Sequence, residues 1–262
     1  MKLKHKEVVK LIEELGRKRG SFVVPLLMDE TRSISRYMVS LVYEKLEGHF
    51  SKEGVTRSNV DVIIHSSGGD ADAAYHLSRI LQEYCGEEHK LAAIIPRFAK
   101  SAATLLACGC DAIAMGPPSE LGPIDPQIED PSTGMWLSAS SISTMIEMMK
   151  KIERGPLLEE FVKKIPVMAM GDFERVRDHT EELVQELLVN RMFKGKAGAE
   201  DKAKEISETL AKGYKFHGKA ITMWEAKKLG LEVEEMPKEQ WTIVWKIFRT
   251  FEEEVLLSGG EA

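Results

Sequence analysis

Alternating strand and helix patterns between Val60 and Met115 constrain the fold of this 262-residue chain more than any other feature. In order, they are a strand at 60–65, a helix at 73–84, a strand at 91–95, a helix at 101–107 and a strand at 111–115. The first helix is amphipathic, and the second is apolar on every side, which indicates burial. Strands that alternate with helices in this way pair in parallel through right-handed crossovers, so we expect an α/β fold.

The flanking segments extend this pattern and set the expected domain organisation. We expect a helix at 2–19, a strand at 21–27, a helix at 33–46 that ends at Gly48, and a mostly helical half from Ser138 onward. Methionines cluster in that half, which is more typical of irregular core packing than of a cofactor site: Met145, Met148, Met149, Met168 and Met170. The expected divisions are an N-terminal helical extension (1–20), a main α/β domain (21–237) and a C-terminal helix (238–262).

The charge and hydropathy of the chain exclude several classes of protein. The chain carries 36 Lys and Arg against 42 Asp and Glu, a net charge of −6, which argues against binding nucleic acid through bulk charge. The longest nearly uncharged apolar stretch, 101–115, contains Asp111 and is too short to span a bilayer. The first twenty residues mix Lys with Glu and lack an apolar core segment, so we expect no signal peptide and no membrane span.

The three cysteines indicate a reducing compartment. Cys85, Cys108 and Cys110 are an odd number for a disulfide framework, and the single C-x-C has no second pair at zinc spacing. Buried, reduced thiols in a cytoplasmic protein are the simplest interpretation. We therefore expect a cytoplasmic chain with no metal and no cofactor.

The first candidate for chemistry is the Gly68–Gly69 pair between a strand and a helix that Asp70 is placed to cap. Glycines at such a turn let the backbone approach a ligand, and free N–H groups at a helix start favour an anion or an oxyanion. A tight turn that needs positive φ angles is the alternative. Neither the G-x-G-x-x-G nor the G-x-x-x-x-G-K-[ST] motif occurs, so a nucleotide site is not indicated.

The second candidate is Ser101, which opens the all-apolar helix. Its hydroxyl would lie near the free backbone amides of the first helical turn, including that of Ala102. A simple N-cap is the alternative interpretation.

Taken together, these motifs resemble the serine dehydrogenase proteinase family of the Clp/crotonase fold, which also includes the signal-peptide peptidase A and Clp-type serine peptidases. The resemblance runs from about Pro25 to Pro237, and its most specific part is the long Leu121–Ile128 run. It is carried by the segments Ile64–Asp70, Ala99–Ala107, Leu121–Ile128 and His217–Thr222, with Glu225 and Ala226. The resemblance implies a repeated ββα superhelix with a largely helical C-terminal part.

The resemblance also implies a serine peptidase that acts on peptides or exposed protein segments, without ATP as a single chain. Ser101 would attack the peptide carbonyl, and the backbone around Gly68, Gly69 and Ala102 would form the oxyanion hole. Relatives in this fold assemble into rings or smaller oligomers, so we expect a homo-oligomer.

The sequence does not identify the general base that would take the proton of Ser101. Clp-type enzymes place a histidine about 25 residues after the serine, but this chain has no histidine between His89 and His179. Signal-peptide peptidase relatives use a lysine 40 to 50 residues downstream of the serine. Lys150 and Lys151 fall in that interval on an apolar-rich helix, where burial would lower an amine pKa, so a Ser/Lys dyad is the leading hypothesis. His217, His65 and Lys100 are the alternatives.

Two other functions stay open on the same fold. A crotonase-type enzyme would use paired amides to hold a thioester enolate and would need no nucleophilic serine. A peptide-binding or scaffold protein would have lost the base. Binding of coenzyme A and labelling by a fluorophosphonate separate these functions from a peptidase.

Overall fold

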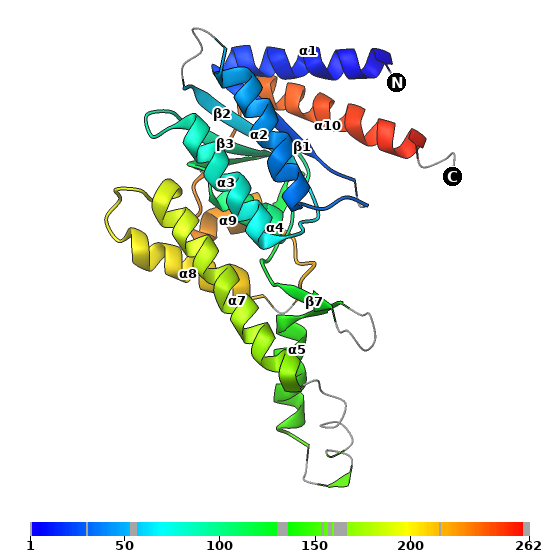
Figure 1. Cartoon of the computed structure of the whole chain (residues 1–262), viewed down its shortest axis with the longest axis vertical. Coiled ribbons are helices and arrows are strands. Elements are labelled where there is room, and N and C mark those ends of the chain that lie inside the picture. The colour runs from blue at the N-terminus through cyan, green and yellow to red at the C-terminus, as the bar shows by residue number, and fades with distance from the viewer. Residues whose placement is uncertain are drawn as a thin grey trace.

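The computed structural model is built around a five-stranded parallel sheet with the strand order β1-β2-β3-β5-β10. Figure 1 labels three of its strands, β1, β2 and β3. Its strands are β1 (Ser21–Leu27), β2 (Asn59–His65), β3 (Leu91–Ile95), β5 (Ala112–Met115) and β10 (Val233–Glu234). The structure describes residues 2–29, 31–52, 57–129, 136–152, 155–156, 159, 167–214 and 216–258.

The strands β3 and β5 are wholly apolar, and β2 is mostly so, because helices cover both faces of the sheet. Along β2, Val62 and Ile64 are fully buried in the larger core, whereas Ile63 points into the smaller core on the opposite face. This alternation follows from the two-residue period of a strand. It assigns each side chain of β2 to one of two layers, and this assignment matters for the site.

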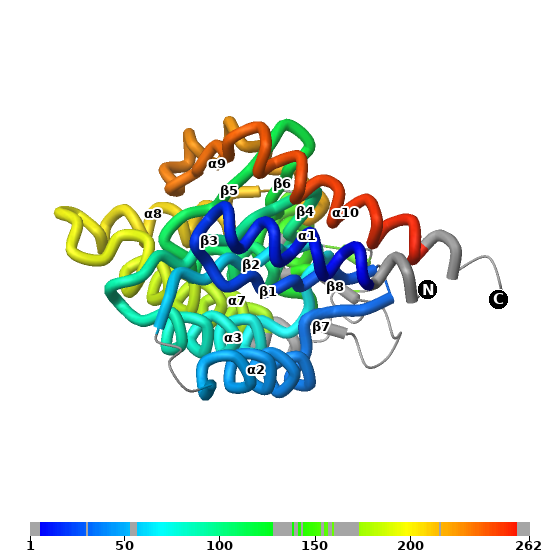
Figure 2. Tube along the Cα trace, turned by 90° about the horizontal axis from the view of Figure 1, so that it is seen from above, coloured from blue at the N-terminus to red at the C-terminus, as the bar shows by residue number. Residues whose placement is uncertain are grey.

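The larger core lies between the sheet and helices α2 (Arg36–Phe50), α3 (Ala71–Cys85) and α4 (Ala102–Cys108), and the smaller core is covered by α1 (Lys2–Arg19) and α10 (Lys238–Ser258). Figure 2 shows α1 and α10 side by side on one side of the strands, with α2 and α3 on the other. The two terminal helices therefore share a core with the sheet. No described helix is both long enough and apolar enough to cross a membrane.

The remaining elements lie at the carboxyl end of the sheet and in the helical half. A small sheet has the order β4-β6-β9, and β7 and β8 form an antiparallel pair. Their bounds are β4 (Phe98–Ala99), β6 (Glu120–Leu121), β7 (Gln127–Glu129), β8 (Trp136–Ser138) and β9 (Ile221–Thr222). The helices are α5 (Ala139–Met149), α7 (Val167–Leu187) with a π-helical turn at Leu188–Met192, α8 (Ala199–Lys212) and α9 (Met223–Leu229).

This architecture confirms the expected α/β class and the parallel pairing of the three central strands. The cap is also confirmed, since Asp70 Oδ1 accepts from the Ala73 N–H at 3.0 Å. The three cysteines are buried free thiols, and burial raises the pKa of Cys108 to about 12.

Two local expectations are wrong. Gly48 does not end its helix, because α2 continues to Phe50; the last turn places Phe50 against Phe22 at a ring distance of 5.7 Å. Met148 does not fill a core, because its side chain is 63% exposed on α5. The side chains of Met168 and Met170 lie outside the described residues.

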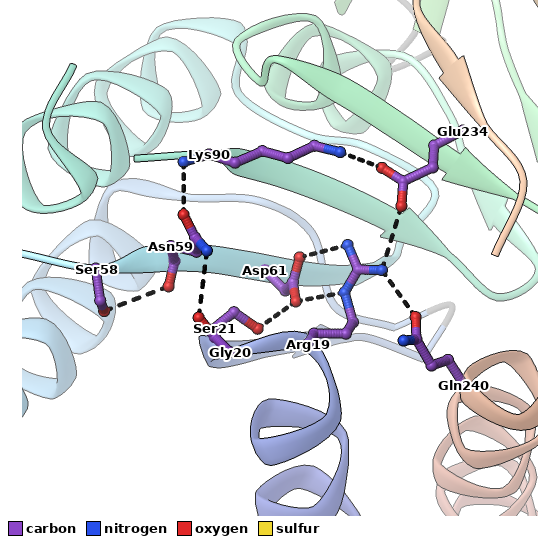
Figure 3. A network of polar contacts seen from close by, with 9 residues as sticks. All are labelled: Arg19, Gly20, Ser21, Ser58, Asn59, Asp61, Lys90, Glu234 and Gln240. Carbon is purple, nitrogen blue, oxygen red and sulfur yellow. Dashed lines mark hydrogen bonds and ion pairs between the residues drawn. The ribbon is translucent and has the colours of Figure 1, made fainter. Parts of the chain in front are cut away.

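A buried charge network joins the two terminal helices to the sheet (Figure 3). Arg19 at the end of α1 donates to both carboxylate oxygens of Asp61 in β2, at 2.6 and 3.0 Å. It also donates to Glu234 of β10 and to Gln240 of α10, at 3.3 and 3.1 Å. The side chains of Arg19 and Asp61 are only 9% and 4% exposed. Each charge therefore needs its partner, because a buried charge without one is costly.

We predict that Asp61→Ala lowers the free energy of unfolding by about 3 kcal/mol, because it leaves the Arg19 guanidinium buried without its bidentate carboxylate. Chemical denaturation measures the loss. Lys18→Ala is the control, since Lys18 pairs with Glu239 at the surface at 3.4 Å and its loss should cost less than about 1 kcal/mol. Equal losses in the two variants would contradict the prediction.

Candidate active site

Ser66 joins the two loops that carry the candidate site. Its backbone N–H donates to the Phe98 carbonyl at 3.1 Å, and its carbonyl accepts from the Lys100 N–H at 3.0 Å. Ser66 follows β2, and Lys100 follows β4. These two bonds hold the Gly68–Gly69 turn beside Ser101 at the carboxyl end of the parallel sheet.

Gly68 packs directly against the serine. A Cβ added at Gly68 would lie 2.8 Å from both the Lys100 carbonyl oxygen and the Ser101 Cβ, and 3.3 Å from the Ala102 nitrogen. The φ angle of Gly68 is also positive, at 116°. Only glycine fits this position, because any side chain would push the turn away from the start of α4.

A second backbone contact fixes the outer side of the turn. Ile34 donates its N–H to the Gly68 carbonyl at 2.7 Å and accepts from the Asp70 N–H at 2.9 Å, so it forms a parallel bridge with Gly69. Gly69 has a φ of 143°, and a Cβ there would overlap the backbone of Ile34. The turn is therefore held on both sides by backbone atoms.

Ser101 adopts a strained conformation. Its φ and ψ are 50° and −122°, and it is the one residue other than glycine with a positive φ in the described part of the chain. Strain of this kind costs about 1–3 kcal/mol and is concentrated at functional sites. Ser101 occupies the N-cap position of α4, but its side chain makes no capping hydrogen bond, so the simple N-cap interpretation does not hold.

Free hydrogen-bonding groups surround the serine. Within the described ranges, the Ser101 hydroxyl and the backbone N–H groups of Gly69 and Ala102 have no hydrogen-bond partner. The N–H of Gly68, in contrast, donates to the Ser66 hydroxyl at 3.1 Å. Of the three residues expected at the oxyanion hole, Gly69 and Ala102 thus have amides free for a ligand, whereas Gly68 provides the space.

Thr104 anchors the segment between β4 and α4 that carries Ser101 (residues 99–101, called the serine loop below). Sequence reasoning missed this residue. It is fully buried, its Oγ1 lies 2.8 Å from the Ala99 carbonyl oxygen, and it accepts from the Gly122 N–H at 3.1 Å. Thr104 therefore fastens the Leu121–Ile128 run to the start of α4. A hydroxyl inside an otherwise apolar helix was the available signal, because a buried hydroxyl must find partners.

Both lysines proposed as the base lie in solvent in this chain. Lys150 is 66% exposed and pairs with Glu147, and the hydrogen bond from Lys150 lowers the pKa of that carboxylate. Lys151 is also exposed. Figure 1 shows α5, which precedes both lysines, extending away from the parallel sheet. The burial that would lower a lysine pKa is absent here, and the role of the two lysines stays a prediction.

Lys100, the alternative lysine, is partly buried, but its ammonium is engaged in hydrogen bonds and an ion pair. Its ammonium donates to the carbonyls of Leu121 and Lys219, at 3.1 and 3.4 Å, and pairs with Glu120 at 3.3 Å. Burial lowers the pKa of this ammonium. These contacts orient it toward β6 and β9 as a structural cation.

The two histidines occupy different surroundings. His65 is 8% exposed, and its ring lies among the aromatic rings of Phe98, Phe248 and Phe251. His217 is half-buried, and its Nδ1 is buried without a hydrogen-bond partner among the described residues.

The small sheet places His217 at the same end as Ser101. β6 runs parallel to β4 and antiparallel to β9, so the segment that precedes Ile221 lies at the end where Ser101 follows β4. The hydrogen bond from Lys100 to the Lys219 carbonyl shows that this segment reaches the serine loop.

The fold and the serine loop define an α/β protein of the ClpP-like class. A model of the ClpP-like SDH-type serine proteinase family matches residues 1–251. The chain therefore belongs to the ClpP-like SDH-type serine proteinase family, which confirms the family indicated by the sequence motifs.

The chain is also similar to two curated proteins in sequence and to solved structures in fold. Two proteins of Methanocaldococcus jannaschii, MJ0137 and MJ1495, are 31% and 28% identical to this chain. The matches cover 90% and 86% of this chain, and 77% and 70% of those proteins. A similar solved structure is a mutant of the 1510-N membrane-bound stomatin-specific protease in complex with a substrate peptide. It matches with a TM-score of 0.51 and 17% identity, over 84% of this chain and 78% of that one, and so shows a common fold.

We predict that Ser101→Gly is more stable than Ser101→Ala by about 1 kcal/mol, because glycine relieves the strained φ and ψ angles whereas alanine keeps them. Chemical denaturation of the two variants measures the difference. Both lack the hydroxyl, so the comparison isolates the backbone. An alanine variant that is as stable as the glycine variant would show that the serine conformation is not strained.

Proposed function

We propose that this protein hydrolyses peptide bonds through nucleophilic attack by Ser101. The observation that carries the proposal is a strained serine whose hydroxyl, like the two neighbouring backbone amides of Gly69 and Ala102, has no hydrogen-bond partner among the described residues. Membership of a serine proteinase family supports the same reaction. The substrate peptide bound to the stomatin-specific protease supports a peptide or an exposed protein segment as the substrate.

In the proposed reaction, a base takes the hydroxyl proton of Ser101 while Oγ forms a bond to the carbonyl carbon of the substrate. The N–H groups of Gly69 and Ala102 hold the negative charge that develops on the carbonyl oxygen. Such preoriented donors stabilise a charge that appears only in the transition state. The C–N bond then breaks, the amine leaves with the proton, and water releases the acyl group from Ser101.

We propose His217 as the base, in preference to the Ser/Lys dyad expected from the sequence. His217 follows the serine end of the small sheet in space, and its buried Nδ1 has no partner among the described residues, whereas Lys150 and Lys151 are exposed just after the end of α5. A neutral imidazole can accept a proton near neutral pH without the desolvation that a lysine requires. The Ser/Lys dyad requires a rearrangement that buries Lys150 or Lys151.

We predict that a fluorophosphonate labels Ser101 and that Ser101→Ala abolishes both labelling and peptide hydrolysis. Mass spectrometry of the labelled peptide identifies the residue, and circular dichroism checks the fold. Ser67→Ala is the control, since this neighbouring serine is exposed and should keep full activity. Undiminished hydrolysis by Ser101→Ala would refute the proposal. Binding of coenzyme A without labelling would favour a thioester enzyme. The absence of both labelling and coenzyme A binding would favour a non-catalytic peptide-binding protein.

We predict that His217→Asn lowers kcat by about 100-fold or more, the usual effect of losing a general base. The paired variants Lys150→Met and Lys151→Met should keep kcat within a few-fold of the parent, because both side chains are exposed. The two sets of variants separate the two bases, because only the residue that takes the proton of Ser101 should cost a large factor in kcat when it is replaced. A large loss in either lysine variant, with normal activity in His217→Asn, would restore the Ser/Lys dyad.

A further inference from the structure

His65 is a buried titratable residue that the proposed reaction does not use. It is the last residue of β2, and its side chain is 8% exposed. The alternation along β2 directs it to the face covered by α10, the same face as Ile63. Ser101 precedes α4, which covers the opposite face. His65 is therefore not placed to take a proton from Ser101.

Three aromatic rings enclose the imidazole and form, with it, an aromatic cluster. The ring of Phe98 lies 4.0 Å away, that of Phe248 4.7 Å and that of Phe251 6.2 Å, measured between ring centroids. Phe98 belongs to β4, whereas Phe248 and Phe251 belong to α10. The cluster thus connects the C-terminal helix to two strands that end at the site.

The imidazole is neutral in this cluster. Its Nδ1 is buried and has no hydrogen-bond partner among the described residues. Burial and, to a smaller extent, the positive charge of Arg97 lower the pKa of His65 to about 4. A neutral ring can pack between Phe98 and Phe248 as a flat, partly polar aromatic group.

Two residues of the cluster, His65 and Phe98, directly precede the two loops that form the site, the Gly68–Gly69 turn and the serine loop. His65 precedes Ser66, whose hydroxyl accepts from the Gly68 N–H, and Phe98 lies three residues before Ser101. The backbone bonds between Ser66 and the Phe98–Lys100 segment join the same two strands. A change in the separation of the rings of His65 and Phe98 would therefore move the Gly69 amide relative to Ser101.

We propose that His65 is a positioning residue, whose ring, held between Phe98 and the aromatic side chains of α10, sets the separation of the Gly68–Gly69 turn and the serine loop. Through this ring, the aromatic contacts that Phe248 and Phe251 of α10 make with His65, and not the aliphatic contacts of α10, bear on the geometry of the oxyanion hole. The kinetic test of this inference rests on the proposed function, because it measures peptide hydrolysis. It concerns His65 and α10, to which the proposed reaction assigns no role.

The test compares His65→Ala with His65→Phe in the full-length protein. Displacing a catalytic group by about 1 Å can cost about 100-fold in rate, so His65→Ala should lower kcat by about tenfold or more, with KM changed by less than about twofold. His65→Phe keeps a ring in the cluster and should restore kcat to within about threefold of the parent. Ile243→Ala is the matched control, since it also removes a buried side chain from the smaller core, on α10 but outside the aromatic cluster, and should keep kcat.

A loss of kcat in His65→Ala no larger than that in Ile243→Ala, at equal loss of thermal stability, would overturn the proposal. Failure of His65→Phe to restore kcat would also overturn it. Should His65→Ala fail to fold, Phe248→Leu replaces it, because this change removes one wall of the cluster and keeps a buried apolar side chain. A drop of kcat in that variant supports the proposal, and parental kcat refutes it.

Amide hydrogen exchange provides a readout that does not need catalysis. His65→Ala should speed exchange in segments 66–69 and 100–103 more than Ile243→Ala does, and His65→Phe should restore protection. Unchanged exchange in these segments would overturn the proposal. If the parent protein shows no labelling or hydrolysis but exchange follows this pattern, the proposed reaction fails while the positioning role stands.

Discussion

The two backbone hydrogen bonds of Ser66 are the interaction on which the candidate site depends. They hold the end of β2 to β4, at 3.1 and 3.0 Å, and so bring together two turns about thirty residues apart in the sequence. Without this junction, the free amide of Gly69 and the hydroxyl of Ser101 would belong to separate loops. Thr104 then locks the serine loop to the Leu121–Ile128 run, so that the site has backbone support on both sides.

Strain and free hydrogen-bonding capacity meet at the same place. Ser101 holds a conformation that glycine would adopt more easily, while Gly68 and Gly69 hold positive φ angles against neighbouring backbone. Elsewhere in the described core, buried hydroxyls such as those of Thr104 and Ser78 are bonded. Among the described residues, donors without partners thus lie beside a strained serine, a combination that is typical of functional sites.

The sequence predicted the elements of the fold because strands that are buried on both faces of a sheet consist mostly of apolar residues. The strands β3 and β5 are continuous apolar runs, and β2 is apolar apart from Asn59, Asp61 and His65; the last of the helices between them ends at Gly109, so the order and the parallel pairing of the strands followed directly. The end of α2 was missed because aromatic contacts of Phe50 outweigh the weak tendency of Gly48 to stop a helix.

The sequence by itself determined the family, the candidate nucleophile and the glycine turn, because each is a short-range pattern of residue types. Only the tertiary structure decided which groups around Ser101 are free: the N–H of Gly68 donates to Ser66, whereas those of Gly69 and Ala102 have no partner in the part of the chain that the structure describes. Helical spacing cannot tell whether a lysine such as Lys150 faces a cleft or solvent. That depends on how α5 packs, and packing arises from contacts between segments distant in the sequence.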